Sequence, residues 1–189
     1  MANFFIYQAD VWCYDDGEAI REKLRRSDKA PPDEDDERSF DSDDYPKGPY
    51  DGEREEADSP QHCAAGADCL NAEVLHDGSE IGQWLENPLT EYGLKHLRGE
   101  VLNLLRGTRI RGSAAVLEFW RNAYADEIGT LHEVAVGEET VYQGFDDREA
   151  ESAFTKYAEQ SDTHRGKAAN ELVKWFHDGK LWEEFDGRS

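Results

Sequence analysis

The sequence predicts an α+β fold with a zinc-ribbon-like N-terminal β part, a central helical hairpin and a C-terminal ββαββ module. Three observations support this prediction. Aromatic and β-branched residues open the chain, two stretches of helical periodicity occupy its middle, and strand and helix patterns alternate in its C-terminal third. The expected divisions are residues 1–29 with 60–88 for the zinc-ribbon-like part, 30–59 for an acidic insert, 89–129 for the helical pair and 130–189 for the ββαββ module.

The first two expected elements are a strand and a helix. Residues 4–13, FFIYQADVWC, are rich in residues that favour strands and are short enough to form one strand. The following stretch, DDGEAIREKLRRS, has acidic residues at its start and basic residues toward its end. The helix dipole favours this polarity, and Ile20 and Leu24 supply a narrow apolar stripe.

Residues 30–59 combine many Asp, Glu, Pro and Gly residues with almost no aliphatic side chain. This composition predicts a disordered insert, because too little apolar surface is present to offset the entropy of ordering. Three interpretations remain open: a solvating spacer, an adaptation to high salt, and ordered carboxylates that imitate the phosphates of DNA. Phe40, Tyr45 and Tyr50 lie within the stretch and could anchor such a surface.

Two helices are expected in the central part. The first is capped by Thr90 and ends at Gly107, and the second runs from Ser113 to Gly129. Apolar residues recur at helical spacing in both, namely Leu94, Leu97, Val101 and Leu104 or Leu105 in the first and Val116, Trp120, Ala123 and Tyr124 in the second. Together they predict a helical hairpin.

The C-terminal third reads as strand, turn and strand around Gly137, then a helix over residues 146–160, then a hairpin at Asp178-Gly179. In the helix, Ala150, Phe154 and Tyr157 are expected to face inward. A two-residue hairpin loop sets the register of the strands that it joins. It predicts the pairs Leu172–Phe185, Lys174–Glu183 and Phe176–Leu181 on one face and Trp175–Trp182 on the other.

Charge and hydropathy limit the partners. The chain of 189 residues has 43 Asp and Glu against 21 Lys and Arg, for a net charge of −22. Direct binding to nucleic acid is therefore not expected, because contact with phosphates needs clustered basic residues. No apolar run reaches the roughly 18 residues of a membrane span, and the first residues lack the basic start of a signal peptide. We expect a cytoplasmic protein with a protein partner and no membrane contact.

The three cysteines are an odd number for a set of disulfides, and two of them lie close together in PQHCAAGADC. Zinc ribbons draw two ligands from each of two turns, which predicts a site at Cys13, Asp16, Cys63 and Cys69, with His62 as a spare ligand. Four protein ligands leave no open position, so a bound zinc would be structural. The alternative is that the cysteines are small hydrophobic residues of a core.

The segments DVWCYDDGEAIR, PQHCAAGADC and WLENPLTEYG resemble a family of small uncharacterised proteins encoded by phages and other mobile elements. In the pattern of that family, C-x-x-C-G-E precedes P-Q-H-C-x5-C, so the position of Asp16 carries a cysteine. The stretch AFTKYAEQSDTHRGKAANELVKWFHDGKLWEEF is also similar to a small module of phage proteins. The resemblance implies a mobile-element origin and a four-ligand metal site, and it implies no activity.

Motifs of known catalytic chemistry are absent from the sequence. Nothing resembles G-x-S-x-G, a phosphate-binding glycine loop or H-E-x-x-H, and the six histidines are scattered and expected to be ordinary surface or core groups. No catalytic or cofactor-binding residue is therefore predicted besides the metal ligands. We expect a non-enzymatic accessory protein that acts through protein–protein contacts. The alternatives are an acidic DNA mimic that inhibits a host restriction, nuclease or CRISPR component, and a halophile-adapted protein.

Overall fold

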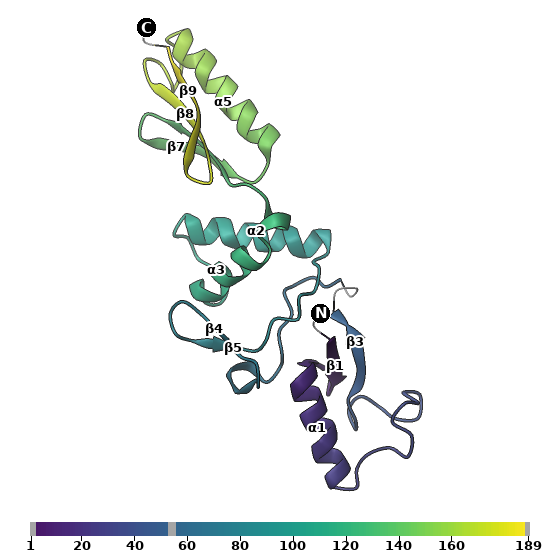
Figure 1. Ribbon diagram of the computed structural model, residues 1–189. Coiled ribbons are helices and arrows are strands. Elements are labelled where there is room, and N and C mark those ends of the chain that lie inside the picture. The colour runs from purple at the N-terminus through teal and green to yellow at the C-terminus, as the bar shows by residue number, and fades with distance from the viewer. Residues whose placement is uncertain (1–2, 53–55, 188–189) are drawn as a thin grey trace. The chain divides into compact units, whose positions relative to one another are not determined.

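The computed structural model describes residues 3–52 and 56–187 and contains both helices and sheets, which confirms the α+β class (Figure 1). The chain divides into two compact units, and each is described by itself. The first comprises Met1–Leu97 and Ile110–Asn122, and the second comprises Arg98–Arg109 and Ala123–Ser189. None of the helices in the described ranges has the length and apolar character that crossing a bilayer requires.

The first unit opens with a β-hairpin, so the prediction of a single strand over residues 4–13 is wrong. Strand β1 (Asn3–Tyr7) pairs antiparallel with β2 (Asp10–Cys13). Gln8 and Ala9 form the turn between them with φ of 54° and 64°. Two residues in the left-handed region match the right-handed twist of the flanking strands, and the aromatic pattern alone did not indicate this turn.

Residues 30–59, which the sequence predicts to be a disordered insert, contain one strand of a sheet. Strand β3 (Lys47–Asp51) pairs with β1 and completes a sheet of order β2-β1-β3. The buried Arg21 donates hydrogen bonds to the carbonyl oxygen of Pro46 at 3.1 and 2.9 Å, and its guanidinium lies 5.3 Å from the ring centroid of Tyr45. The contacts of Arg21 with a carbonyl oxygen and an aromatic ring thus hold the segment in place, although it lacks the aliphatic residues of an ordinary core. Part of the predicted insert, residues 53–55, lies outside the described residues.

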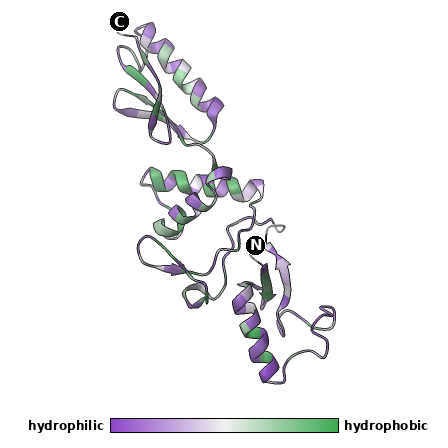
Figure 2. Cartoon of the chain, in the orientation of Figure 1, coloured by the Kyte–Doolittle hydropathy of each residue, from purple (hydrophilic) through white to green (hydrophobic). Residues whose placement is uncertain are grey.

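Helix α1 (Tyr14–Arg26) forms where the sequence predicts a helix. Figure 2 shows that hydrophilic residues dominate it, while β1 is largely hydrophobic. Its buried face contains Asp16, Gly17 and Arg21, whereas Ile20 and Leu24 are only half-buried. A Cβ atom on Gly17 would lie 2.1 Å from Cδ2 of Phe5, so the close approach of α1 to β1 requires glycine at this position.

The chain then crosses a loop region before the helices. The short 3-10 helix η2 (Gly66–Asp68) precedes a two-stranded sheet of β4 (Glu73–Val74) and β5 (Glu80–Ile81). Helix α2 (Glu91–Leu105) is capped as predicted, because the Thr90 hydroxyl accepts a hydrogen bond from the Gly93 amide at 3.0 Å. The second predicted helix is divided at Tyr124 into α3 (Ala114–Ala123) and α4 (Ala125–Ile128).

The second unit contains the predicted ββαββ order. Strands β6 (His132–Val136) and β7 (Glu139–Gly144) precede helix α5 (Asp147–Asp162), and β8 (Leu172–His177) and β9 (Lys180–Asp186) follow it. The sheet has the order β7-β6-β8-β9, and α5 lies along one of its faces (Figure 1). An apolar core joins the helix to the sheet through Val134, Val136, Ala150, Phe154, Ala168, Val173 and Trp175.

The predicted register of the last hairpin is correct only next to the turn. Phe176 pairs with Leu181 as expected, but Trp175 pairs with Glu183, and Val173 rather than Leu172 pairs with Phe185. A β-bulge leaves Trp182 without a partner residue in the ladder and shifts every later pair by one position. The Trp182 ring instead stacks on His177, with ring centroids 4.5 Å apart, so aromatic stacking accompanies the loss of regular register.

Candidate metal centre

Two segments that lie far apart in the sequence supply a compact group of potential metal ligands in the first unit. Cys13 ends β2, Asp16 lies in the first turn of α1, and Cys63 and Cys69 flank η2. One ligand atom from each residue lies within 4.8 Å of the others, and all four residues are buried. The structure thus brings together the four residues that the sequence predicts, and they could hold a metal ion.

The positions of Cys13 and Asp16 follow from a junction between strand and helix. Helix α1 begins at the residue after Cys13, so residues three apart lie on the same face of its first turn. The Cys13 thiol donates a hydrogen bond to Oδ2 of Asp16 at 3.1 Å. This junction differs from the turn of a zinc ribbon that the spacing suggested, because the ligand pair is followed by a helix rather than by a strand.

Backbone contacts hold the second ligand pair in place. The Cys63 amide donates to the Gln83 carbonyl at 2.9 Å, and the Ala64 amide donates to the Val11 carbonyl at 2.8 Å. A Cβ atom on Gly82 would lie only 2.1 Å from the Cys63 carbonyl oxygen. Gly82 therefore permits the chain to pass directly against Cys63, a role that no spacing in the sequence indicated.

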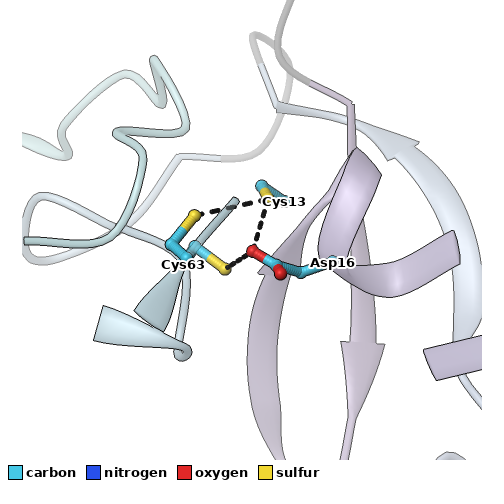
Figure 3. A group of neighbouring side chains, drawn as sticks. Cys13, Asp16 and Cys63 are labelled. Atoms are coloured by element: carbon cyan, nitrogen blue, oxygen red, sulfur yellow. Dashed lines mark hydrogen bonds between the residues drawn. The ribbon is translucent and has the colours of Figure 1, made fainter. Parts of the chain in front are cut away.

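The four side chains already interact with one another. Figure 3 shows the side chains of Cys13, Asp16 and Cys63 pointing toward a common centre. Asp16 Oδ2 accepts hydrogen bonds from the Cys63 thiol at 3.2 Å and from the Leu70 amide at 3.3 Å, besides the one from Cys13. The sulfur atoms of Cys13 and Cys69 are 3.7 Å apart, too far for a disulfide bond.

Electrostatics within the group favour ionised ligands at two positions. The contact with Cys13 lowers the pKa of the Cys63 thiol to about 7, and the contact with Cys63 together with burial raises the pKa of Cys13. Burial raises the pKa of Cys69. Burial alone would also raise the pKa of Asp16, but hydrogen bonds from the three thiols lower it below its usual value. At neutral pH the Asp16 carboxylate is therefore ionised and the Cys63 thiol partly so, and a cation would neutralise this buried negative charge.

Surrounding residues connect the two ligand segments and exclude water. The Asn71 amide group donates to Asp15 Oδ2 at 2.7 Å, and the Gln83 backbone amide points at the Cys69 sulfur at 3.5 Å. Phe4 and Leu85 pack with the three cysteines in one buried apolar cluster. Such outer contacts orient ligands and keep the site dry.

His62, the predicted spare ligand, does not belong to the group. Its ring stacks on Trp120 with centroids 6.4 Å apart, and its Nδ1 lies 3.3 Å from the Cys63 carbonyl oxygen. The side chain therefore packs against α3 instead of facing the thiols. Adjacency in the sequence to Cys63 did not indicate this direction.

Comparisons with protein-family models, curated proteins and solved structures found no match. Function must therefore be argued from the geometry and chemistry of this chain alone. The site consists of four buried potential ligands from two segments of the chain, namely three sulfur atoms and one carboxylate oxygen.

Proposed function

We propose that the first unit binds one structural zinc ion through Cys13, Asp16, Cys63 and Cys69, and that the protein acts without catalysis, through contacts with another protein. The observation that supports this most directly is the burial of the Asp16 carboxylate among three thiols. Within residues 3–52 and 56–187, its hydrogen bonds come from thiols and an amide, and no Lys or Arg side chain forms an ion pair with it. A buried carboxylate without a positive partner is costly, and a metal ion supplies that partner.

Zinc fits the ligand set better than other common ions. It accepts thiolate and carboxylate ligands in tetrahedral geometry, with bonds of about 2.0–2.3 Å, so neighbouring ligand atoms lie about 3.3–3.8 Å apart. Cys13 Sγ lies 3.1 Å from Asp16 Oδ2 and 3.7 Å from Cys69 Sγ, and both distances are close to that range. Calcium and magnesium prefer oxygen ligands throughout. The interpretation of the cysteines as plain hydrophobic residues leaves the carboxylate in their midst unexplained.

A structural role follows from the number and placement of the ligands. Four protein ligands fill a tetrahedral zinc and leave no position for substrate or an activated water molecule. The ion would join the end of β2 and the start of α1 to the segment around η2, two parts of the chain that lie far apart in the sequence. Zinc in such a place contributes directly to folding.

Exposed apolar side chains beside the ligands support a role in protein–protein contact. Tyr14 and Leu70 directly follow Cys13 and Cys69, and they are 46% and 65% exposed. Val74 in β4 is 69% exposed. Exposed apolar groups on a small protein are typical of contact surfaces when they gather near one another. Metal binding would fix the backbone positions of Tyr14 and Leu70.

The test is the zinc content of protein purified without a chelator or an affinity tag, compared between the native chain and Cys63→Ser. We expect about one zinc per chain in the native protein and none in the variant. Ala64→Ser, which introduces the same side chain at the neighbouring exposed position, is the control and should retain the metal. A native protein that contains no metal and whose three thiols react freely before denaturation would contradict the proposal.

Asp16→Cys sharpens the test, because it exchanges the one oxygen ligand for the softer thiolate. We expect this variant to retain zinc against at least tenfold more chelator, about 1.4 kcal/mol of extra binding free energy. Asp16→Asn removes the charge while preserving the shape of the side chain, and it should release zinc more easily than the native protein. Equal retention by all three proteins would mean that Asp16 is not a ligand.

The order of the acidic segment supports a second candidate function, mimicry of DNA. Tyr45 is 1% exposed and its hydroxyl donates to Glu34 at 2.6 Å, while Phe40 packs edge-on against Tyr45 with ring centroids 5.5 Å apart. These anchors hold a surface on which six carboxylates are exposed: Asp33, Asp35, Asp36, Asp41, Asp43 and Asp44. A fixed array of negative charge can occupy a site that normally binds phosphates.

Displacement of a labelled DNA duplex from purified restriction, nuclease and CRISPR enzymes tests this second candidate. A mimic should displace the duplex with an affinity that falls steeply with salt and that is lost when the six exposed aspartates are replaced by asparagine. The matched control replaces six exposed acids in α5 and β9 instead. Absence of displacement at low salt for every enzyme tested would contradict the candidate.

A further inference from the structure

The second unit contains a group of metal-binding side chains that is separate from the cysteine site. His132 at the start of β6, His177 at the end of β8 and Asp147 at the start of α5 each place one potential ligand atom within 4.8 Å of the others. We infer that these residues form a second metal site, for a divalent first-row transition metal bound by two imidazoles and one carboxylate. The inference goes beyond the structural zinc proposed for the first unit and does not depend on it.

The sheet itself brings the two histidines together. Strands β6 and β8 are antiparallel neighbours, and His132 and His177 are directly paired across them. Next to this pair, the Leu131 amide donates to the Asp178 carboxylate at 3.0 Å, and the Asp178 amide donates to the Leu131 carbonyl at 2.8 Å. These hydrogen bonds fix the end of the ladder and therefore the separation of the two imidazole rings.

The carboxylate is positioned by the start of helix α5. Asp146 is the N-cap residue, and its side chain accepts a hydrogen bond from the Glu149 amide at 3.0 Å. The Tyr142 hydroxyl donates to the Asp146 carbonyl at 3.0 Å, which joins the helix start to β7. Asp147 follows directly, and its Oδ1 lies 3.9 Å from Nε2 of His132.

Two features of the histidines point to a missing partner. His132 is only 5% exposed, and beside it, with ring centroids 4.5 Å apart, the Nε2 of His177 is buried without a hydrogen-bond partner among the described residues. Buried polar atoms in folded proteins nearly always have a partner. The 3.9 Å between His132 and Asp147 is too long for a hydrogen bond, whereas two ligands of one ion lie about 3–4 Å apart when each bond is about 2.0–2.2 Å.

The ligand chemistry selects the class of ion. Two imidazoles with one carboxylate suit Fe²⁺, Co²⁺ and Zn²⁺, and this set lacks the oxygen ligands that calcium and magnesium need. Three protein ligands leave at least one coordination position for water or another small ligand. The Asp147 side chain is 71% exposed, so the site is open to solvent on the side of the carboxylate. The Trp182 ring stacked on His177 covers that imidazole.

Cobalt is a suitable probe because it distinguishes the two sites in one experiment. Thiolate ligands give Co²⁺ an intense charge-transfer absorption, which imidazole and carboxylate ligands do not give. We add Co²⁺ to protein that holds a single equivalent of zinc, which the four-ligand cysteine site takes up first, and follow both the absorption and the histidine ring signals by NMR. We expect binding of one equivalent without the thiolate band, with paramagnetic broadening of the His132 and His177 signals and of no other histidine.

Variants then test the ligand assignment. His177→Gln should abolish this binding, and Asp147→Asn should weaken it at least tenfold. Asp162→Asn, at the other end of the same helix and equally on the surface, is the matched control and should bind as the native protein does. Native binding by Asp147→Asn, or unchanged His132 and His177 signals at saturating Co²⁺, would overturn the inference. A thiolate band that appears alone would report exchange at the cysteine site and would also count against the second site.

Discussion

The cores of the two units contain different chemistry. In the ββαββ unit, the buried residues that join α5 to the sheet are all aliphatic or aromatic. In the first unit, a buried cluster combines Phe4 and Leu85 with three cysteines, and a carboxylate lies beside them. The ββαββ core can therefore be stabilised by apolar burial alone, whereas the cysteine cluster gains its full stability only when its charge is neutralised. The comparison predicts that the units respond differently to metal removal and to core truncation.

Metal removal should have the largest effect, and its effect on stability should fall mainly on the first unit. Apparent binding energies of structural zinc in small domains are about 10–16 kcal/mol, which exceeds the stability of most domains of this size. After treatment with a chelator, we expect amide protons of β1, β2 and β3 to lose protection from hydrogen exchange. Amide protons of β6 and β8 should keep their protection, because an apolar core joins these strands to α5 and the histidine site lies only at the strand ends. The measurement is hydrogen exchange by NMR before and after chelation.

Restoring zinc should return the protection in the first unit. Magnesium at the same concentration is the control ion and should not do so, because it binds thiolates poorly. Equal loss of protection in both units after chelation would contradict the comparison and would indicate that the two units unfold together.

Phe154→Ala should destabilise the second unit and leave the first unit unchanged. Phe154 is 7% exposed and packs in the core between α5 and the sheet, with its ring centroid 5.8 Å from that of Trp175. Truncation of a buried phenylalanine costs about 3–5 kcal/mol of the free energy of unfolding. We expect the second unit to melt at lower temperature while zinc content and the protection of β1 remain unchanged. A loss of zinc in this variant would show that the cores are coupled.

Gly82→Ala should produce a smaller effect within the first unit. The added methyl group would meet the Cys63 carbonyl oxygen at 2.1 Å, so the ligand loop has to shift. Crowding of this kind costs about 1–3 kcal/mol, and we expect faster loss of zinc to a chelator together with a lower melting temperature. Gly99→Ala is the matched control, because its Cβ would meet nothing within 4 Å and alanine favours a helix by about 1 kcal/mol. Unchanged zinc release in Gly82→Ala would mean that the loop adapts without cost.

Local patterns in the sequence predict the second unit well and the first unit less well. Periodicity and the Asp178-Gly179 turn identify every element from β6 to β9, because each is specified by residues close together in the chain. The errors arise where distant or uncommon interactions decide. Arg21 orders the acidic stretch through Pro46 and Tyr45, and the bulge at Trp182 shifts a register that the turn alone would set.

The candidate sites show the same limit. Residue type and spacing predict the group of Cys13, Asp16, Cys63 and Cys69, since thiols at close spacing are an unusual signal in a chain with three cysteines. The contribution of Gly82 depends on a backbone contact that spacing does not encode. The spacing of the histidines likewise does not indicate the group of His132 and His177, which only the pairing of β6 with β8 brings together.

The smallest expected effect concerns acid stability in the first unit, where charged contacts replace apolar ones. The ion pair with Arg25 and the hydrogen bond from Tyr45 lower the pKa of Glu34 to about 2. Because the folded-state pKa lies below the ordinary value, this contact stabilises the fold above about pH 4.5, and the stabilisation is lost as the pH falls from there toward 2.

Glu34→Gln should therefore be less stable than the native protein near neutral pH, by about 0.2–1 kcal/mol, and the two should converge in acid. Because any loss of metal in acid would be common to both proteins, their difference in unfolding free energy at each pH isolates Glu34. Asp43→Asn, which removes an exposed carboxylate of the same segment, is the control. A difference for Glu34→Gln that stays constant from pH 6 down to about pH 2 would show that the Arg25 contact does not order this segment, and the contrast between a charged and an apolar core would then rest on the metal site alone.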